Sequence, residues 1–316
     1  MKVVFMGTPD FAVDALQAII EAGHEVTAVV TQPDKPKGRG KEMQATPVKT
    51  CALEHHIPVF QPVKVKEPEA VETLRSYEAD IFVVVAFGQI LSEEILQMPK
   101  YGCVNIHASL LPKYRGAGPI QWAIIDGEKE TGITIQQMDK GVDTGDILFQ
   151  SVVPIDAKET GESLFEKLAK AGAALIVEAL PKIEAGEVTP RKQDESQASH
   201  AKMLQKSMSR IDWNRKAAEL DCLIRGMISW PGASSGYHGK TLKIWQQEPV
   251  TKDQLPAEAL AGAEPGTVIA VEKDAIYVQT GEGALKLTEV QLEGKKRMAV
   301  KDFLLGYPVQ PGEMLA

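Results

Sequence analysis

The sequence predicts an α/β fold, a doubly wound and mostly parallel sheet, followed by a small antiparallel β-barrel. Two observations predict the sheet. Apolar runs alternate with helix-like stretches over residues 1 to about 125, and one run, Ile81–Val85, is continuously apolar, as in strands buried on both faces. A third observation predicts the barrel, because short strand-like runs follow one another after residue 207 without long helices. A chain of 316 residues is long enough for two domains.

The first β-α-β unit begins the sheet. The apolar run Lys2–Met6 predicts a strand, the helical spacing over Phe11–Ala22 predicts a helix, and Glu25–Thr31 predicts a second, parallel strand. The turn at Gly7 lacks the G-x-G-x-x-G spacing of dinucleotide sites, and Pro9 removes a backbone N–H that would bind phosphate. We therefore do not expect a nicotinamide cofactor.

The remaining elements of the sheet domain follow in order. Thr46 is expected to cap a helix that begins with Pro47. The other expected helices are Glu67–Tyr77, a short one within Gly88–Pro99, Pro119–Asp126, and Thr160–Gly186 with a kink at Pro181. The other expected strands are Val59-Phe60, Asp80–Phe87, Gly132–Met138 and Ile147–Ile155.

One stretch combines a strand end with a loop rich in proline and glycine. Its strand, Cys103-Val104-Asn105-Ile106-His107, alternates so that Asn105 and His107 share one side. Two neighbouring polar side chains at a strand end are costly if they are merely buried. This stretch therefore predicts a functional site.

The following strand, Gly132–Met138, leads into a turn that carries Asp139, Asp143 and Asp146. Ligands of open α/β sheets bind outside the carboxyl ends of the strands. An amide, an imidazole and a carboxylate are thus expected to meet at one edge of the sheet.

The composition shifts to polar residues with few apolar ones between the two parts, which predicts a linker. We expect a catalytic domain over 1–188, the linker over 189–206, and the β-barrel domain over 207–316. Trp213 and a helix to about Met227 open the second domain, and its expected strands are Thr241–Trp245, Thr267–Val271, Ala275–Thr280 and Leu285–Leu292.

Composition narrows the class of protein. With 44% hydrophobic and 25% charged residues, no long apolar run and no secretory signal, we expect a cytoplasmic monomer without membrane contact. Three widely spaced cysteines match no metal-ligand spacing, so we expect no metal and reduced thiols. The net charge of −8 disfavours a general nucleic-acid coat, although the acid excess lies before Gln205 and leaves RNA binding open.

The motifs N-I-H-x-S-L-L-P-x-x-R-G at 105–116 and D-x-G-x-D-T-G-D at 139–146 carry a family resemblance. They resemble formyltransferases that use 10-formyltetrahydrofolate, most closely those acting on methionyl-initiator tRNA. The supporting stretches are Met6-Gly7-Thr8-Pro9-Asp10-Phe11-Ala12, Thr31-Gln32-Pro33-Asp34, Gly38-Arg39-Gly40-Lys41 and Ile211-Asp212-Trp213. The resemblance covers nearly the whole chain and implies that the barrel is of the oligonucleotide-binding type.

The resemblance implies a catalytic trio of Asn105, His107 and Asp143. Direct attack of an amine on a formyl carbon creates an oxyanion, which Asn105 and a protonated His107 would stabilise. Asp143 would orient the imidazole and accept protons. A structural role for each residue, or a hydrolase triad with Ser109, is the competing interpretation, but Ser109 lacks the G-x-S-x-G context.

The resemblance also implies the binding contacts. It places Ser109, Leu110, Leu111 and Pro112 at the folate; the neighbouring Ala108 stands where many relatives have Gly. It places the cations of the loop, Lys35, Lys37, Arg39 and Lys41, at the tRNA acceptor end. From the residues alone, a solvated loop is the favoured interpretation, and the resemblance reverses this preference. For the cluster Lys295-Lys296-Arg297, a solvated turn and part of a basic face are equally supported.

Three functions compete. The first is formyl transfer to methionyl-initiator tRNA, and the second is formyl transfer to a small amine such as a sugar or a nucleotide. The third is an RNA-binding module with an inactive α/β domain, which the intact trio disfavours. A small-molecule enzyme would not need the cationic loop or a second barrel.

Overall fold

The computed structural model describes residues 1–37 and 42–315, and its contacts divide the chain into two compact units. The first unit consists of Met1–Pro119, Glu130–Pro154 and Leu164–Lys202. The second consists of Ile120–Lys129, Ile155–Ser163 and Met203–Ala316. None of the described helices is long and apolar enough to cross a bilayer.

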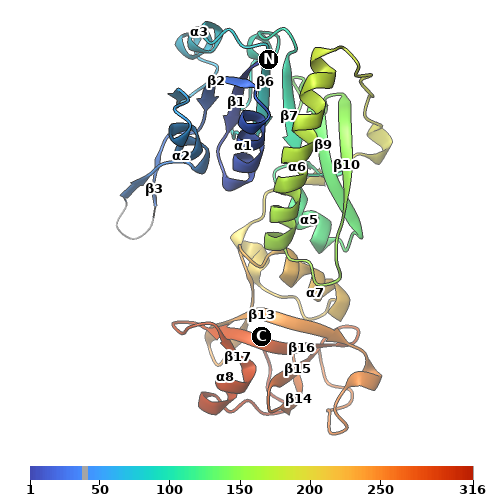
Figure 1. Cartoon of the computed structure of the whole chain (residues 1–316). Coiled ribbons are helices and arrows are strands. Elements are labelled where there is room, and N and C mark those ends of the chain that lie inside the picture. The colour runs from blue at the N-terminus through green and yellow to red at the C-terminus, as the bar shows by residue number, and fades with distance from the viewer. Residues whose placement is uncertain (38–41, 316) are drawn as a thin grey trace. The chain divides into compact units, whose positions relative to one another are not determined.

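The first unit is built on a seven-stranded sheet with the order β10-β9-β7-β6-β1-β2-β5 (Figure 1). The strands from β5 to β7 in this order are parallel, and β9 and β10 are antiparallel to their neighbours. Their bounds are Lys2–Gly7 (β1), Glu25–Val30 (β2), Val59–Phe60 (β5), Ile81–Val85 (β6), Cys103–His107 (β7), Glu130–Gln137 (β9) and Ile147–Pro154 (β10). All five residues of β6 are buried, as its apolar run predicted.

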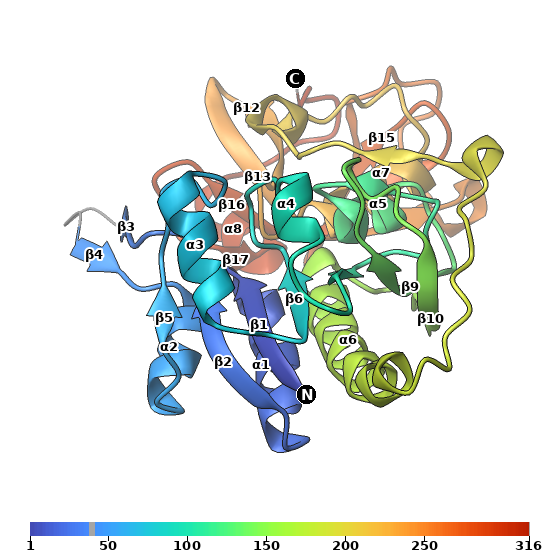
Figure 2. The same cartoon turned by 90° about the horizontal axis from the view of Figure 1, so that it is seen from above.

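Helices cover both faces of this sheet. Figure 2 shows α3 and α4 on one face and α1 and α6 on the other. The helices of the first unit are α1 (Val13–Glu21, after a 3-10 turn at Asp10–Ala12), α2 (Pro47–Glu54), α3 (Pro68–Ser76), α4 (Glu93–Leu96) and most of α6 (Gly161–Glu184). In α6, a Cβ at Gly172 would lie only 3.0 Å from Ile106 of β7, so the glycine lets this helix approach the sheet closely.

The termini of the helices follow local chemistry. The hydroxyl of Thr46 accepts a hydrogen bond from the backbone N–H of Lys49 at 3.1 Å and caps α2, as predicted. The long helix α6 continues through Pro181 to Glu184. At its start, Thr160 and Ser163 exchange hydrogen bonds between each hydroxyl and the other's backbone N–H. This arrangement differs from the usual capping box in that a serine stands where Glu or Gln is usual.

The second unit holds an antiparallel sheet of the order β12-β13-β16-β15-β14, with β17 pairing to β16. The bounds are Ala233–Tyr237 (β12), Lys240–Val250 (β13), Val268–Glu272 (β14), Ala275–Gln279 (β15), Ala284–Leu292 (β16) and Met298–Ala299 (β17). Its helices are α5 (Pro119–Ile125, mostly in this unit), α7 (Ala217–Gly226) and α8 (Val300–Gly306). The predicted fold class, a mostly parallel Rossmann-like sheet followed by a separate small antiparallel β domain, is confirmed.

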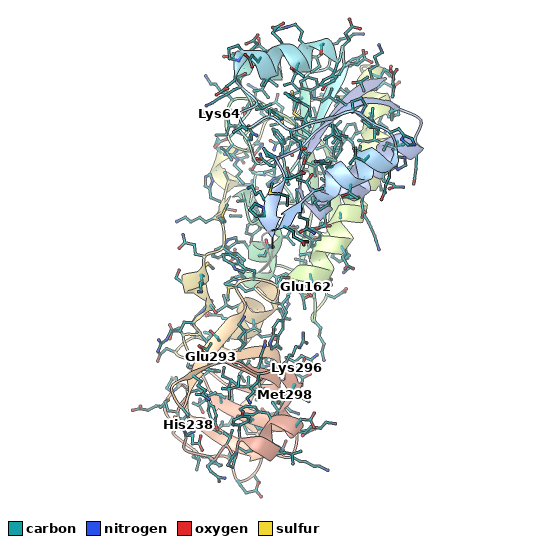
Figure 3. The ribbon with its side chains drawn as sticks, turned by 90° about the vertical axis from the view of Figure 1, so that its left-hand side faces the viewer. Lys64, Glu162, His238, Glu293, Lys296 and Met298 are labelled. Atoms are coloured by element: carbon teal, nitrogen blue, oxygen red, sulfur yellow. The ribbon has the colours of Figure 1, made fainter. Side chains whose placement is uncertain are left out.

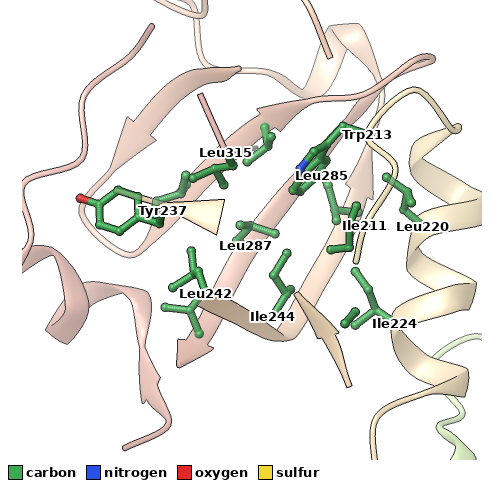
Figure 4. Packing of buried hydrophobic residues seen from close by; sticks show 14 of the residues in the cluster. Ile211, Trp213, Leu220, Ile224, Tyr237, Leu242, Ile244, Leu285, Leu287 and Leu315 are labelled. Carbon is green, nitrogen blue, oxygen red and sulfur yellow. The ribbon is translucent and has the colours of Figure 1, made fainter. Parts of the chain in front are cut away.

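A large apolar cluster fills much of the second unit, and a smaller one is built mainly from residues of β14 and β15. Figure 4 shows Leu287 of β16 near Leu242 and Ile244 of β13, and Leu285 of β16 beside Trp213, with Ile224 of α7 on the Ile244 side of the cluster. The other labelled residues of this cluster are Ile211, Leu220, Tyr237 and Leu315. The indole N–H of Trp213 donates to the Ser235 hydroxyl at 2.9 Å, so the ring is buried without an unsatisfied donor.

The strand β12 and the helix α8 were not predicted. The sequence of β12, Ala-Ser-Ser-Gly-Tyr, has weak β propensity, and its strand conformation comes from antiparallel pairing with β13. This pairing is long-range information that a local pattern does not carry.

The basic cluster Lys295-Lys296-Arg297 lies in the turn between β16 and β17, of which Figure 3 labels Glu293 and Lys296. The Arg297 guanidinium pairs with Glu289 at 2.6 Å and lies 4.5 Å from the centre of the Trp245 ring. Lys295 and Lys296 are exposed.

Two further short pairings involve loops of the first unit. The strands β3 (Lys35–Lys37) and β4 (Glu42–Gln44) form a hairpin. The strand β8 (Arg115–Gly116) pairs in parallel with β11 (His200–Ala201), which lies within the stretch expected as a linker.

Candidate active site

Strand β7 brings Asn105 and His107 to one face of the sheet. Val104 and Ile106 alternate with them and are buried on the opposite face. The thiol of Cys103 is fully buried, and this burial raises its pKa to about 12. Cys103 is therefore a packing residue and not a nucleophile.

The ring of His107 is oriented by the loop that follows β7. Its Nε2 lies 2.9 Å from the carbonyl oxygen of Tyr114. Since a carbonyl can only accept, Nε2 carries a proton, and Nδ1 is the nitrogen that gains or loses one. Nδ1 lies 3.6 Å from a carboxylate oxygen of Asp143, so the exchangeable position of the ring faces an acid.

The carboxylate of Asp143 is the point where the predicted residues meet. Its backbone has φ +54°, in the left-handed region that L-residues seldom adopt, and such strain concentrates at functional sites. The groups around this carboxylate are the backbone N–H of Gly116 (2.8 Å), Gln136 Nε2 (2.8 Å), Asn105 Nδ2 (3.3 Å) and His107 Nδ1 (3.6 Å). Asn105, His107 and Asp143 thus lie together at the carboxyl end of β7.

The two other aspartates of this turn have different surroundings. One carboxylate oxygen of Asp139 accepts hydrogen bonds from the Gly141 N–H at 2.9 Å and the Thr144 hydroxyl at 2.7 Å, which shapes the turn. The backbone carbonyl of Asp146 accepts from the N–H of Gln137 at 2.8 Å. Of the three aspartates, Asp143 is the one whose carboxylate is described in contact with Asn105 and His107.

Gln136 is a site residue that the sequence interpretation missed. It is 1% exposed, it lies opposite Asn105 in the pairing of β7 with β9, and its amide donates to Asp143. Its Oε1 has no hydrogen-bond partner among the described residues, which is costly for a buried oxygen. A polar residue at the end of β9, directly before the acidic turn, was the available signal.

Arg115 was also missed as a charged member of the site. The residue is 3% exposed, and its guanidinium forms paired hydrogen bonds with Glu195 at 2.7 and 3.0 Å. The bonds to Glu195 are the main cause that raises the pKa of Arg115, with Asp139 and Asp143 adding to it. A buried cation thus lies beside the acidic turn.

The segment predicted to contact folate follows β7 directly. The Ser109 side chain is fully buried, and its hydroxyl donates to the Lys113 carbonyl at 2.6 Å. The Leu111 backbone N–H donates to the Thr134 hydroxyl at 3.0 Å. Leu110 and Pro112 are partly exposed.

The hydrolase interpretation lacks geometric support. In a triad, the imidazole of His107 would accept the proton of the Ser109 hydroxyl. The hydroxyl proton instead goes to Lys113, while the two ring nitrogens of His107 face Tyr114 and Asp143.

The predicted tRNA contacts lie in the β3–β4 hairpin. Lys35 is exposed at its start, Lys37 ends β3, and Arg39 and Lys41 lie outside the described residues. Asp34, just before the hairpin, accepts from Lys49 Nζ at 2.6 Å and from Gln61 Nε2 at 2.6 Å. These bonds lower the pKa of Asp34, so its charge is already paired and does not offset the loop cations.

Within the residues that the structure describes, no group of three His, Cys, Asp or Glu side chains could hold a metal ion. The site described above offers two side-chain amides, an imidazole and a carboxylate. Such groups stabilise an oxyanion and transfer protons.

Solved structures share this fold. An N-formyltransferase from Helicobacter canadensis, in complex with folinic acid and dTDP-3-aminofucose, matches with a TM-score of 0.66 at 18% identity over 94% of this chain and 100% of that one. HypX from Aquifex aeolicus, in complex with tetrahydrofolic acid, matches with a TM-score of 0.63 at 19% identity over 100% of this chain and 50% of that one. At these identities the likeness shows the fold alone.

Sequence relatives identify the family. The family model "Formyl transferase" matches residues 1–180, and "Formyl transferase, C-terminal domain" matches residues 203–308. A methionyl-tRNA formyltransferase of Agathobacter rectalis is 55% identical over 99% of this chain and 98% of the relative. One of Lachnospira eligens is 53% identical over 100% and 99%. With this identity along the whole chain and the convergence of Asn105, His107 and Asp143, the chain belongs to the methionyl-tRNA formyltransferase family.

Proposed function

We propose that this chain transfers the formyl group of 10-formyltetrahydrofolate to the free amino group of methionyl-initiator tRNA, giving N-formylmethionyl-tRNA for translation initiation. The full-length relatives at 46–55% identity bear the name of this activity. The single observation that supports the chemistry best is that the Asp143 carboxylate lies against both Asn105 and His107.

Asn105 suits the role of an oxyanion donor. Its NH₂ group has two donors, and one of them is directed to Asp143 at 3.3 Å. The second N–H is left to stabilise the oxygen of the formyl group as negative charge develops on it. A donor of this kind is worth about 10²- to 10³-fold in rate.

His107 and Asp143 suit the transfer of protons. Because Nε2 of His107 is committed to the Tyr114 carbonyl, any proton that the ring gives or takes passes through Nδ1. Nδ1 lies 3.6 Å from the Asp143 carboxylate, so a proton can pass between the ring and the acid beside the oxyanion. Asp143 accepts the proton that the attacking amine loses, directly or through water, and the folate supplies the formyl carbon when bound.

We further propose that Ser109, Leu110, Leu111 and Pro112 line the folate site. The donor set next to them fits a formyl carrier, because it pairs a neutral amide with a group that protonates a leaving nitrogen. Leu110 and Pro112 supply the side-chain surface, since Ser109 and Leu111 are buried. Ser109 would act through its backbone, because its hydroxyl is bonded to Lys113.

Lys35, Lys37, Arg39 and Lys41 are proposed to bind phosphates of the tRNA. Arginine and lysine bind phosphates, and the neighbouring glycines in the sequence, Gly38 and Gly40, let a backbone follow a curved phosphate chain. Asp34, just before the hairpin, is paired with Lys49 and so does not neutralise Lys35.

The finer organisation remains a prediction. We keep the catalytic domain at 1–188, the linker at 189–206 and a tRNA-binding barrel at 207–316. A monomeric state, a cytoplasmic location, the absence of a metal requirement and the OB-type class of the barrel are likewise predictions.

The test is a direct comparison of acceptors. The purified chain is supplied with 10-formyltetrahydrofolate and with methionyl-initiator tRNA, free methionine, a sugar amine or glycinamide ribonucleotide. We expect formylation of the charged tRNA at a kcat/KM at least about 10³-fold above that of the small amines, because only the tRNA engages the remote binding surface. Comparable or faster formylation of a small amine would overturn the proposal and favour the small-molecule alternative.

A further inference from the structure

We propose that the segment Arg191–Ala201, here called the clamp segment, positions the catalytic turn, and that Gln193 is a positioning residue for Asp143. The inference rests on the proposed function, because it assumes that Asp143 takes part in the transfer. The same segment looks like a linker in the sequence, since it is polar and lacks periodicity. Three of its polar side chains, those of Gln193, Glu195 and Ser199, instead form hydrogen bonds with the loops that carry the site.

The side chain of Gln193 joins the acidic turn that carries Asp143 to the loop after β7. Both donors and both acceptors of its amide take part. Its Nε2 donates to the carbonyl oxygens of Asp143 at 2.8 Å and Gly145 at 2.7 Å. Its Oε1 accepts from Nε of Arg115 at 3.0 Å and from a terminal nitrogen of Arg115 at 2.9 Å. One amide therefore fixes the backbone of the acidic turn to the loop that follows β7.

The Arg115 side of this bridge is also fixed. Its guanidinium is held by Glu195, two residues further along the clamp segment, and its backbone N–H donates to the carbonyl of Ser199 at 2.8 Å. The next residue, Gly116, donates its N–H to the Asp143 carboxylate. The clamp segment thus supports Asp143 on both sides, at its backbone carbonyl and at its carboxylate.

The clamp segment is anchored at its two ends by backbone pairing. At one end, Arg191 and Ile147 exchange N–H to carbonyl hydrogen bonds at 2.8 and 2.9 Å, four residues after Asp143. At the other end, the parallel pair β8–β11 aligns Gly116 with Ala201. Gln193 lies between these anchors, so its amide is preorganised for the bridge.

The backbone of Asp143 explains why such support is needed. A left-handed aspartate is held only where its surroundings determine the conformation. Without the Gln193 bridge, the turn can relax and move the carboxylate away from His107 Nδ1. Displacements near 1 Å at a reacting group cost about 10²-fold in rate.

The first experiment compares Gln193→Ala with Gln197→Ala. Gln197 is the matched control: it is exposed on the same segment, and its described side-chain bond is to Asp194. We expect Gln193→Ala to lower kcat about 10- to 100-fold while the KM values for tRNA and folate change less than about twofold. Gln197→Ala should retain wild-type kcat. Equal behaviour of the two variants would overturn the inference.

Gln193→Glu separates the two halves of the bridge. It keeps an acceptor for Arg115 but replaces the NH₂ donor that faces the two carbonyls of the turn with an oxygen. We expect a loss at least as large as in Gln193→Ala, because like partial charges then face each other. Wild-type activity of Gln193→Glu would contradict the role of the two donated hydrogen bonds.

A double-mutant cycle tests whether Gln193 acts through Asp143. In an Asp143→Asn background, we expect Gln193→Ala to lower the residual rate by less than about twofold, since the carboxylate that it positions is already gone. A full multiplicative loss would show that Gln193 acts independently of Asp143 and would overturn the inference.

Amide hydrogen exchange gives a readout that does not depend on the reaction. Gln193→Ala should speed exchange in residues 139–146, whereas Gln197→Ala should not. If the amides of residues 139–146 were as well protected from exchange in Gln193→Ala as in wild type, the role of the clamp segment would be contradicted, even if the variant were active. A wild-type chain that fails to formylate methionyl-tRNA would overturn the proposed function alone.

Discussion

The catalytic edge and the basic hairpin are both loop regions of the first unit, yet they are built in opposite ways. At the catalytic edge, Asp143 lies against Gly116, Gln136, Asn105 and His107. In the hairpin, β3 and β4 pair with each other, and all three residues of β4 are exposed. A reacting group needs a fixed position, whereas attraction between cations and phosphates tolerates movement. The contrast predicts that changes at the edge lower kcat and that changes in the hairpin raise KM.

The largest effect should come from removing the imidazole. We expect His107→Ala to lower kcat/KM about 10²- to 10⁴-fold, because both the charge near the oxyanion and the proton donor are lost. Folate and tRNA should still bind. The measurement is steady-state formylation together with circular dichroism and thermal unfolding, to show that the fold is retained. Turnover within about threefold of wild type would remove His107 from the chemistry.

A backbone change at the edge should have the next largest effect. Gly116 has φ +108°, and a Cβ there would lie 2.8 Å from the carbonyl oxygen of Ala201. We expect Gly116→Ala to lower kcat about 10- to 100-fold, because the N–H that holds Asp143 is displaced.

The matched control for this change is Gly186→Ala. Gly186 has φ +70°, and a Cβ there would meet nothing within 4 Å. Gly186→Ala introduces similar backbone strain but no close contact with another residue. The variant should therefore lose some stability and keep its kcat. Equal kcat values for Gly116→Ala and Gly186→Ala would contradict the conclusion that catalysis depends on the exact position of the Asp143 carboxylate.

Changes in the hairpin should alter KM for the tRNA and not kcat. We expect the double variant Arg39→Ala, Lys41→Ala to raise KM for methionyl-tRNA about 10-fold and leave kcat and folate KM near wild type. The slope of log KM against log salt should fall by about 1.5 to 2, since about two phosphate contacts are lost. Removing two charges at Lys170 and Lys182 on α6 provides the control. An unchanged KM for the hairpin variant would end its assignment to tRNA.

The smallest effect on activity is expected at Cys103. Its thiol has a pKa raised from 9.0 to about 12 by burial, so the neutral form is favoured in the folded state. This contribution to stability is fully present below pH 9 and is lost as the pH rises toward 12. The free energy of unfolding, measured with urea between pH 8 and about pH 10.5, should therefore fall more steeply in wild type than in Cys103→Ala. Parallel curves of unfolding free energy against pH for the two proteins would contradict this expectation. The activity of Cys103→Ala at pH 7.5 should stay within about twofold of wild type.

Local sequence patterns predicted most of the strands and helices and the placement of Asn105 and His107 on one side of a strand end. They succeeded where periodicity is strong, as in Ile81–Val85, and where a cap has a local partner, as at Thr46. The family motif added the choice of Asp143 among three aspartates, which spacing alone left open.

What the patterns missed depends on contacts between distant residues. Gln136 was read as one residue of a strand, and its role is visible only through its pairing opposite Asn105. Gln193 lies 50 residues from Asp143 in the sequence, inside a polar stretch that resembles a linker. Polarity predicted solvent exposure there, but the hydrogen bonds of Gln193 to both loops are tertiary information.

The most direct test of the contrast is to measure kcat and KM for methionyl-tRNA in Asp143→Asn and in the Arg39→Ala, Lys41→Ala variant side by side. We predict that Asp143→Asn lowers kcat about 10²-fold or more with little change in KM, and that the hairpin variant raises KM with little change in kcat. If both variants moved the same parameter, the separation between a fixed catalytic edge and an adaptable tRNA-binding hairpin would be contradicted.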